Sequence, residues 1–328
     1  RVAPLPIVLI GFPLPPYASP DYAALHVLGR ILGDGDASRL DRKLVNSEHP
    51  LCESVSAYPH ALQDAGLFIV SGTAMQGKDP AAVKAALFEV VDDVVKNGVT
   101  PEEIAKAKLM GKKAIVGDRE TCDQLAASVG EEELFANDAD RVNTTVDRMF
   151  AVTAADVQRV ADKYLLQDHS TTLVTLPDPK AGVAQGEAAS EVKKLAEAPV
   201  ATTNRVVLPR PVTFPEGYPT RPPVATDAAN PVFTKGEERT IDGGKVIVME
   251  DHRLPLVSWN ITLRRGGYGA PEGQEGVATL TAGLIARGAA GMNYQQLSED
   301  LDARAIELQA SDGGDYTRIS GSAFTDEL

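Results

Sequence analysis

Cysteine, tryptophan and long apolar runs are all scarce in this sequence. Its 328 residues include two cysteines and one tryptophan. Cys52 and Cys122 form neither a disulfide framework nor a paired metal-binding motif, so we expect two buried free thiols. No apolar run approaches the roughly 20 residues that a membrane-spanning helix needs, and we therefore expect no membrane span. An initiating methionine and a signal peptide are also lacking, and we expect both ends to lie inside a longer protein.

Positive charge is in short supply as well. The chain has 32 Lys and Arg against 46 Asp and Glu, which gives a net charge of −14. Binding to nucleic acid or to an anionic membrane needs a basic patch, so this balance argues against both partners. Hydrophobic residues make up 43% and charged residues 24%, which are ordinary values for a globular protein. The length allows two domains, with part of a third.

Residues 1–179 predict one α+β domain. The predicted elements are, in chain order, a strand at 7–12, helices at 19–32 and 38–46, strands at 52–58 and 66–73, helices at 79–97, 100–135 and 153–164, and a strand at 171–176. The Ser-Pro pair at 19–20 predicts the start of the first helix, because serine caps and proline suits the first helical position. Thr100 and Glu103 form a capping box for the long helix, in which we expect a break near Gly117 or Gly130. This order favours helices packed on one face of a largely antiparallel sheet.

The character of the sequence changes at Lys180. From there to about Pro231, Pro, Ala, Glu, Thr and Asn dominate, which is typical of an extended interdomain linker. Residues 232–328 then predict a truncated second unit that begins with strands. Its predicted elements are strands at 238–241, 245–249 and 256–263, helices at 276–288 and 294–304, and strands at 306–310 and 316–321. Asp242-Gly243-Gly244 is a strong turn signal for a hairpin between the first two strands.

Several motifs resemble the M16 zinc peptidases, the insulinase and pitrilysin family. The motifs similar to the family's second, "inactive" domain are Pro20-Asp21-Tyr22-x-Ala24-Leu25, Ile31-Leu32-Gly33 and Ser38-Arg39-Leu40. The motifs similar to the start of a family N-terminal domain are Gly243-Gly244-Lys245-Val246-Ile247-Val248, Pro255-Leu256-Val257, Arg265-Gly266-Gly267 and Glu275-Gly276-Val277-Ala278, with Gly288 beyond them. The resemblance covers the whole chain except the linker, and it implies M16 peptidase-like domains in which helices cover an antiparallel sheet.

The resemblance also implies where the family's chemistry would be found. An active member carries His-x-x-Glu-His on a helix of its first domain, with two zinc ligands and a general base. In this chain the matching positions are Thr279, Ala282 and Gly283, none of which can bind zinc or accept a proton at neutral pH. An Arg/Tyr pair seven positions apart binds the substrate carbonyl in the family, and the matching loop here, from Val45 to Cys52, lacks it. We therefore expect no catalytic, cofactor-binding or metal-binding residue in this chain, and we expect the zinc in a preceding first domain.

Other chemistry finds little support in the residues. The five histidines never occur as His-x-x-x-His, which disfavours a zinc site. The acidic runs at 34–36 and 312–315 lack the closing Glu of a calcium loop and are interpreted as turns. The acidic pairs at 102–103 and 131–133 are interpreted as helix caps and solvated faces.

The leading hypothesis is that the chain is the non-catalytic central part of an M16-type zinc metallopeptidase, where it forms chamber wall and hinge. The parent would hydrolyse peptide bonds with a zinc-bound water, and its partners would be a peptide or unfolded polypeptide and the remaining M16 domains or a homologous subunit. The alternative is a catalytically inactive homologue that acts as a structural or assembly subunit, or as the partner of an active subunit. Family resemblance suggests an exported, periplasmic location.

Overall fold

Four antiparallel strands form the framework of the first domain in the computed structural model, which describes residues 5–177, 217, 235–264, 266–289 and 291–328. The strands are β1 (Ile7–Leu14), β2 (Cys52–His60), β3 (Gly66–Ala74) and β4 (Thr171–Thr175), in the spatial order β2-β3-β1-β4. Ile10 is opposite Val70 on one side and Thr172 on the other. We call residues 5–177 the N-terminal domain.

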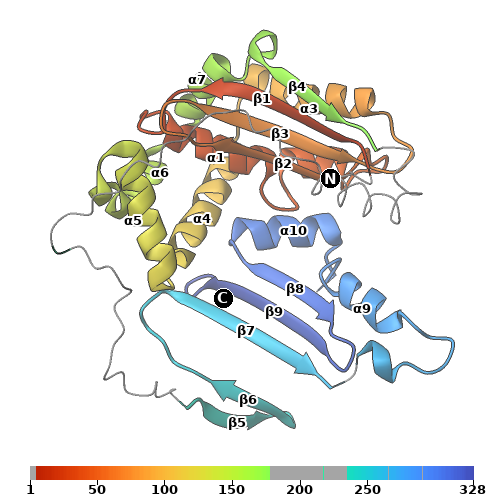
Figure 1. Cartoon of the computed structure of the whole chain (residues 1–328). Helices are drawn as coiled ribbons and strands as arrows, with labels where there is room; N and C mark the ends of the chain where they lie inside the picture. Colours follow the sequence, from red (N-terminus) through yellow and green to blue (C-terminus); the bar gives the residue numbers. More distant parts are fainter. Residues whose placement is uncertain (1–4, 178–216, 218–234, 265, 290) are drawn as a thin grey trace, which may run out of the picture. The chain divides into compact units, whose positions relative to one another are not determined.

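Helices cover one face of this sheet (Figure 1). The α-helices of the N-terminal domain are α1 (Tyr22–Gly33), α2 (Arg39–Leu44), α3 (Pro80–Asn97), α4 (Pro101–Gly117), α5 (Cys122–Ala136), α6 (Thr145–Ala151) and α7 (Ala154–Tyr164), and short 3-10 turns lie at η1 (Ala139–Asn143) and η2 (Gln167–His169). The predicted capping box is present, because Thr100 accepts from the backbone of Glu103 while the Glu103 carboxylate accepts from the backbone of Thr100. The break in the long helix lies after Gly117, and Gly130 is inside α5.

The start of the first helix differs from the prediction. Residues 19–20 lie in a turn, and α1 begins at Tyr22 with Asp21 as its N-cap residue. The Asp21 side chain makes no capping bond. Its carboxylate instead accepts hydrogen bonds from Arg159, Lys163 and Tyr164 of α7. The Asp21 carboxylate therefore forms long-range ion pairs with α7, although local rules would assign it to capping α1.

The core of the N-terminal domain lies between the helices and the inner face of the sheet. Phe12, Phe68, Leu28 and Leu87 are all completely buried. Phe12 packs edge-on against Phe88 of α3, with ring centroids 6.4 Å apart. At about 25 cal/mol per Å² of apolar surface, burial on this scale provides most of the stability of an α+β domain.

Residues 254–328, called here the C-terminal module, form one compact unit together with the N-terminal domain. The module contains β7 (Leu256–Leu263), η3 (Gly267–Gly269), α9 (Val277–Ile285), α10 (Tyr294–Ala303), β8 (Glu307–Asp312) and β9 (Thr317–Phe324). Its strands make an antiparallel sheet in the order β7-β9-β8. α9 packs against β8 and β9, and α10 packs against α4 of the N-terminal domain.

Residues 179–253 form a separate unit, of which the structure describes residues 217 and 235–253. Here β5 (Glu237–Ile241) and β6 (Gly244–Val248) pair as an antiparallel hairpin. Asp242 and Gly243 both have positive φ, of 52° and 81°, as the predicted two-residue turn requires. Apart from Gly217, the predicted linker at 180–231 lies outside the described residues, and the predicted boundaries 1–179, 180–231 and 232–328 stay predictions.

The mixture of helices with antiparallel sheets confirms the predicted α+β class. Helix α6 was absent from the prediction, because its seven residues are too few to show a clear helical period. Within the described part of the chain, no helix has the length and apolar character to cross a membrane.

Candidate functional site

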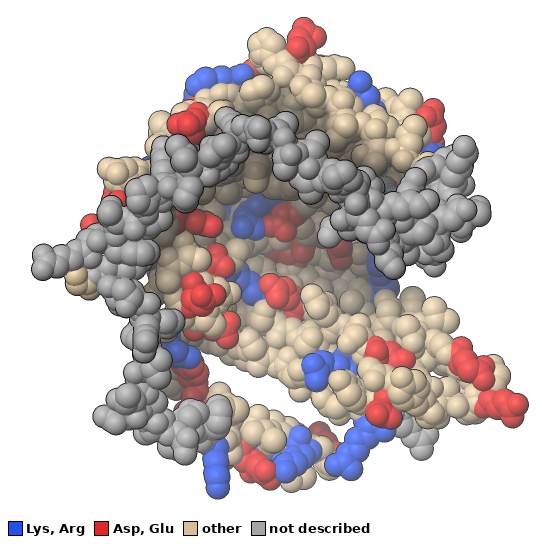
Figure 2. Space-filling model, in the orientation of Figure 1, with Lys and Arg blue, Asp and Glu red and all other residues tan. Residues whose placement is uncertain are grey.

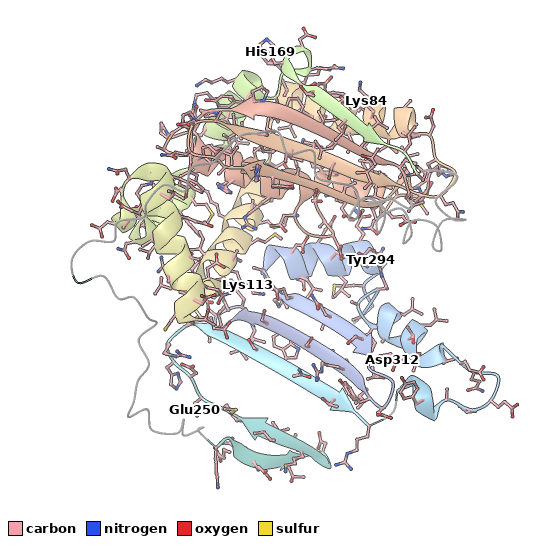
Figure 3. The ribbon with its side chains drawn as sticks, in the orientation of Figure 1. Lys84, Lys113, His169, Glu250, Tyr294 and Asp312 are labelled. Carbon is pink, nitrogen blue, oxygen red and sulfur yellow. The ribbon has the colours of Figure 1, made fainter. Side chains whose placement is uncertain are left out.

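The three positions of the degenerate zinc motif lie on α9. The Thr279 hydroxyl donates a hydrogen bond of 2.8 Å to Asp312, which ends β8 beside this helix (Figure 3). Ala282 is 3% exposed, and a Cβ built on Gly283 would meet no atom within 4 Å. A hydroxyl, a methyl group and a bare backbone provide no imidazole or carboxylate for zinc, so the residues at this place do not fit the metal.

Val45 and Cys52 bracket the loop that follows α2. Val45 is the C-cap residue of α2 and packs at the edge of the hydrophobic core, while Cys52 is 1% exposed at the start of β2. Burial raises the pKa of the Cys52 thiol to about 11, which keeps it protonated and inert. Both side chains are thus packing residues, and no oxyanion-binding group stands at either position. The prediction that both thiols are buried was wrong for Cys122, which is exposed at the start of α5.

Metal-binding clusters are also missing from the described ranges. Among these residues, no group of three or more His, Cys, Asp or Glu side chains is arranged to hold a metal ion. The acidic run at 34–36 includes Gly35 with a φ of 84°, and Asp312 accepts hydrogen bonds from the backbone of Gly267 and Gly314. Both runs therefore serve as turns, which agrees with their interpretation from sequence.

The outer face of the four-stranded sheet is a candidate binding surface, because it exposes apolar side chains and carries no charged residue. We call it the open face. The strand register assigns to it Ile7, Leu9, Gly11 and Pro13 of β1, Ser54, Ser56, Tyr58 and His60 of β2, Leu67, Ile69, Ser71 and Thr73 of β3, and Thr171, Leu173 and Thr175 of β4. Tyr58, Leu67 and Leu173 are 46%, 40% and 60% exposed. None of these positions carries Asp, Glu, Lys or Arg, although such residues make up 24% of the chain.

This composition suits an extended apolar ligand. An exposed apolar surface on a folded domain marks a site for a partner or ligand more often than chance. Ser56 and Ser71 share a hydrogen bond of 2.8 Å across β2 and β3, so their hydroxyls are already partly satisfied. A charged ligand would lose its hydration here without gaining an opposite charge, whereas an apolar segment would lose little.

A second hollow is lined mainly by charged side chains, which make up 12 of its 20 lining residues. This charged cleft has a volume of about 1030 Å³ and is lined by residues of α2, α3, the start of α4 and α10. Arg39 holds its wall together, through 2.7 and 2.8 Å bonds to Glu103 and a 2.9 Å bond to Asp93. The Arg39 guanidinium and the Thr100 backbone outweigh the effect of burial and lower the pKa of Glu103. The sequence identified Glu103 as a cap but gave no sign of its second role, because Arg39 lies 64 positions away.

Glu132 shows a further role that sequence reasoning missed. The acidic run at 131–133 was interpreted as a solvated face, but Glu132 is 5% exposed and accepts hydrogen bonds from Tyr17 and Thr145. Arg141 and Arg148 form ion pairs with it at 3.1 and 3.3 Å. Burial and the neighbouring carboxylate raise the pKa of Tyr17 to about 12. The prediction was wrong because α5 packs this turn against the N-terminal loop, which no local pattern reveals.

Charges of both signs are distributed over the visible surface. Figure 2 shows Lys and Arg interspersed with Asp and Glu, with no continuous basic region on this face.

Comparison with known proteins gives one family-model match, which covers part of the N-terminal domain. Residues 1–110 match the family model of the peptidase M16 inactive domain. A protein named zinc protease PqqE, from Helicobacter pylori, is 24% identical over 170 residues, which are 52% of this chain and 38% of that protein. The mitochondrial-processing peptidase subunit alpha of Solanum tuberosum is 26% identical over 133 residues, or 40% of this chain and 26% of that protein. The chain thus spans well under half the length of these relatives.

A solved structure shares the fold. The crystal structure of a protease from Helicobacter pylori superposes with a TM-score of 0.50 at 23% sequence identity, over 53% of this chain and 42% of that one. Another similar structure is described as the inactive peptidase domain of a putative zinc protease from Bordetella parapertussis, with a TM-score of 0.49, 23% identity and coverage of 54% and 94%.

Proposed function

Because residues 1–110 match the family model of the peptidase M16 inactive domain and one relative is named a zinc protease, we propose that this chain is a non-catalytic wall and hinge segment of an M16-type zinc metallopeptidase. Its N-terminal domain would bind the polypeptide substrate, and peptide hydrolysis with zinc would take place in another domain of the parent. The open face is the observation that carries the proposal, since it offers exposed apolar side chains and no formal charge over 15 outward positions of four strands.

The absence of chemistry at the motif positions supports the same role. Thr279, Ala282 and Gly283 provide no zinc ligand and no base. We therefore expect the purified chain to bind no zinc stoichiometrically and to hydrolyse no peptide bond. Tight zinc at one equivalent, or hydrolysis that a chelator abolishes, would contradict this part of the proposal.

A binding titration with an unfolded polypeptide tests whether the open face binds substrate. The probe is a fluorescently labelled, reduced and carboxymethylated protein, which stays unfolded, titrated with the full chain and followed by anisotropy. Leu173→Asp places a charge on the open face, and we expect it to weaken binding about tenfold because the charge is desolvated when a segment docks. Leu134→Asp is the matched control, since Leu134 lies on α5 outside the open face and is 61% exposed against 60% for Leu173.

The control decides the interpretation. Equal losses in both variants would mean that net charge governs binding and would overturn the assignment of the open face. Unchanged binding in both variants would overturn it as well.

A second candidate is a catalytically inactive subunit that works with an active partner. One relative is itself named a subunit of a processing peptidase, which favours this alternative. The two candidates differ in where the zinc motif resides. Tandem mass spectrometry of the natural protein would find the motif in the same polypeptide under the first proposal and in a separate co-purifying chain under the second. An exported location is also a proposal, and cell fractionation with an antibody against this chain would test it.

A further inference from the structure

The contact between the C-terminal module and the N-terminal domain has an uneven distribution of charge. Three ion pairs join described residues of the two parts. They are Lys106 with Asp302 at 3.9 Å, Lys113 with Glu307 at 3.2 Å and Arg42 with Glu299 at 3.6 Å. In each pair the cation comes from the N-terminal domain and the anion from the module. We call this set of pairs the ionic interface.

Asp302 lies at the centre of the ionic interface. Its side chain is 14% exposed, and its Oδ2 accepts a 3.0 Å hydrogen bond from the backbone N–H of Ala37. Lys106 donates a 3.0 Å bond to the carbonyl of the same residue. The loop also approaches closely, because a Cβ added at Gly35 would lie 2.5 Å from the Asp302 Oδ2. The loop between α1 and α2 is thus built to receive this carboxylate.

Lys113 makes the second anchor at the other end of α4. Its side chain, 10% exposed, also donates a 3.0 Å hydrogen bond to the carbonyl of Ser322 in β9 (Figure 3). Beside it, the Lys112 ammonium lies 4.8 Å from the ring centroid of Phe324. Cations of α4 therefore contact both a strand backbone and an aromatic ring of the module.

Apolar burial in the module is slight. Its buried apolar residues among the described ones are Ala282, Leu297, Ala305, Ala323 and Phe324, three of which are alanines. A contact held by little apolar area and by partly exposed charge pairs is sensitive to salt, because the Debye length falls from about 10 Å at 0.1 M to about 3 Å at 1 M. Screening should act mainly on Arg42 with Glu299 and on Lys113 with Glu307, since Glu299 and Glu307 are 45% and 66% exposed, and less on Lys106 with Asp302, which are both 14% exposed. The charged cleft is lined from both sides of this contact, by Lys106 of α4 and by Tyr294 and Glu299 of α10.

We propose that the C-terminal module docks reversibly on the N-terminal domain through the ionic interface, and that undocking at high ionic strength opens the charged cleft. The proposal concerns a movement within this chain and is independent of what the open face binds. It makes the charge pairs, rather than a packed apolar core, the determinant of the closed arrangement.

The chain carries a natural pair of probes for this movement. Its single tryptophan, Trp259, is in the module, and its exposed cysteine, Cys122, is in the N-terminal domain. Cys52 is 1% exposed and stays unlabelled in the folded chain. A tryptophan-quenching acceptor on Cys122 therefore reports the separation of the two parts by energy transfer, without any substitution.

The experiment measures energy transfer in the full chain as NaCl is raised from about 0.1 M to about 1 M. We expect transfer to change in a saturable manner, while the far-UV circular dichroism stays constant. Lys113→Glu should produce the undocked value already at low salt, with the docking equilibrium shifted about tenfold, because repulsion from Glu307 replaces attraction. The charge swap Lys113→Glu/Glu307→Lys should recover most of the docked value.

The matched control is Lys96→Glu, which reverses the same kind of charge. Lys96 also lines the charged cleft, but its partner Asp92 is on the same helix. It should leave transfer unchanged. The proposal is overturned if transfer is independent of salt, or if Lys96→Glu changes it as much as Lys113→Glu does. If Lys113→Glu unfolds the module, the salt titration of the unsubstituted chain still decides the question.

Discussion

Two antiparallel sheets in this chain are built on similar patterns but are buried to very different extents. The inner face of the β2-β3-β1-β4 sheet contributes Val8, Ile10, Phe12, Phe68 and Val70, all completely buried. In the β7-β9-β8 sheet the outward positions of β7 at 257, 261 and 263 are 37%, 50% and 49% exposed, although they are apolar. Alternation alone therefore does not bury a face, because a helix layer must also be available to cover it.

The difference lies in the helices. α1, α3 and α7 all pack against the first sheet, whereas α9 packs mainly on β8 and leaves β7 open. α9 itself exposes Leu280 and Leu284 at 67% and 65%. Stability should therefore be concentrated in the N-terminal domain, and the predictions below test this contrast from the largest expected effect to the smallest.

Phe68→Ala should have the largest effect. It removes a fully buried ring and should lower the free energy of unfolding by about 3–5 kcal/mol. Leu284→Ala, its counterpart in the module, should change it by no more than about 0.5 kcal/mol. Urea unfolding followed by far-UV circular dichroism measures both values. Similar losses in the two variants would contradict the contrast between the sheets.

Asp21→Ala tests the ion pair that replaces a helix cap. Burial alone would raise the pKa of Asp21, but the bonds from Tyr164, Arg159 and Lys163 outweigh it and lower the pKa to about 2. A lowered folded-state pKa gives stability that is present above the unfolded value of about 4 and is lost as pH falls through about 2. We expect a loss of about 2 kcal/mol at pH 7.

The control for this substitution is the pH dependence. Because the substitution removes the titrating group, the difference between variant and parent should shrink as the pH falls from 5 to about 2. A difference that stays constant over this range would show that packing, and not charge, explains the loss.

Asp41→Asn should act in the opposite direction. Burial, followed by the nearby Asp36 and Asp302, raises the pKa of Asp41 to about 6. Because the pKa of Asp41 is higher in the folded chain than in the unfolded chain, its contribution to folding stability is favourable below the unfolded-state pKa. That contribution is lost as pH rises through about 6. The neutral amide should therefore stabilise the chain by about 1 kcal/mol at pH 8 and by almost nothing at pH 4, after allowance for solvent screening. Thermal unfolding at the two pH values measures this, and destabilisation at pH 8 would contradict it.

Thr279→Val should have the smallest effect. It removes the bond from α9 to Asp312 but keeps the shape of the side chain, at an exposed position. We expect a change within about 0.5 kcal/mol, seen as a small shift of the Trp259 emission transition in urea. A loss above about 2 kcal/mol would show that the module depends on this contact as the N-terminal domain depends on its core.

Local patterns predicted most elements of the chain. β7 was predicted at its exact bounds, and the capping box at Thr100 and the turn at Asp242 and Gly243 are present as expected. These features are governed by interactions within a few residues, so the sequence is sufficient to specify them. The helix predicted from Ser19 begins at Tyr22, because residues 19–22 first close a turn in which the Ser19 hydroxyl accepts from the backbone of Asp21. The pairing of Asp21 with α7 could not be predicted, since that contact exists only after folding.

Some features of the candidate site could likewise be predicted from the sequence, and others could not. The residue types at 279, 282 and 283 exclude zinc ligation whatever the fold, because ligand chemistry belongs to the side chains themselves. The open face and the ionic interface could not be predicted, since the first depends on the register of four strands and the second on pairs such as Lys113 and Glu307, far apart in the chain. The sequence thus determined which chemistry is absent and where the elements lie. Only the tertiary structure decided which charges meet and which apolar face stays uncovered, because both depend on distance in space rather than along the chain.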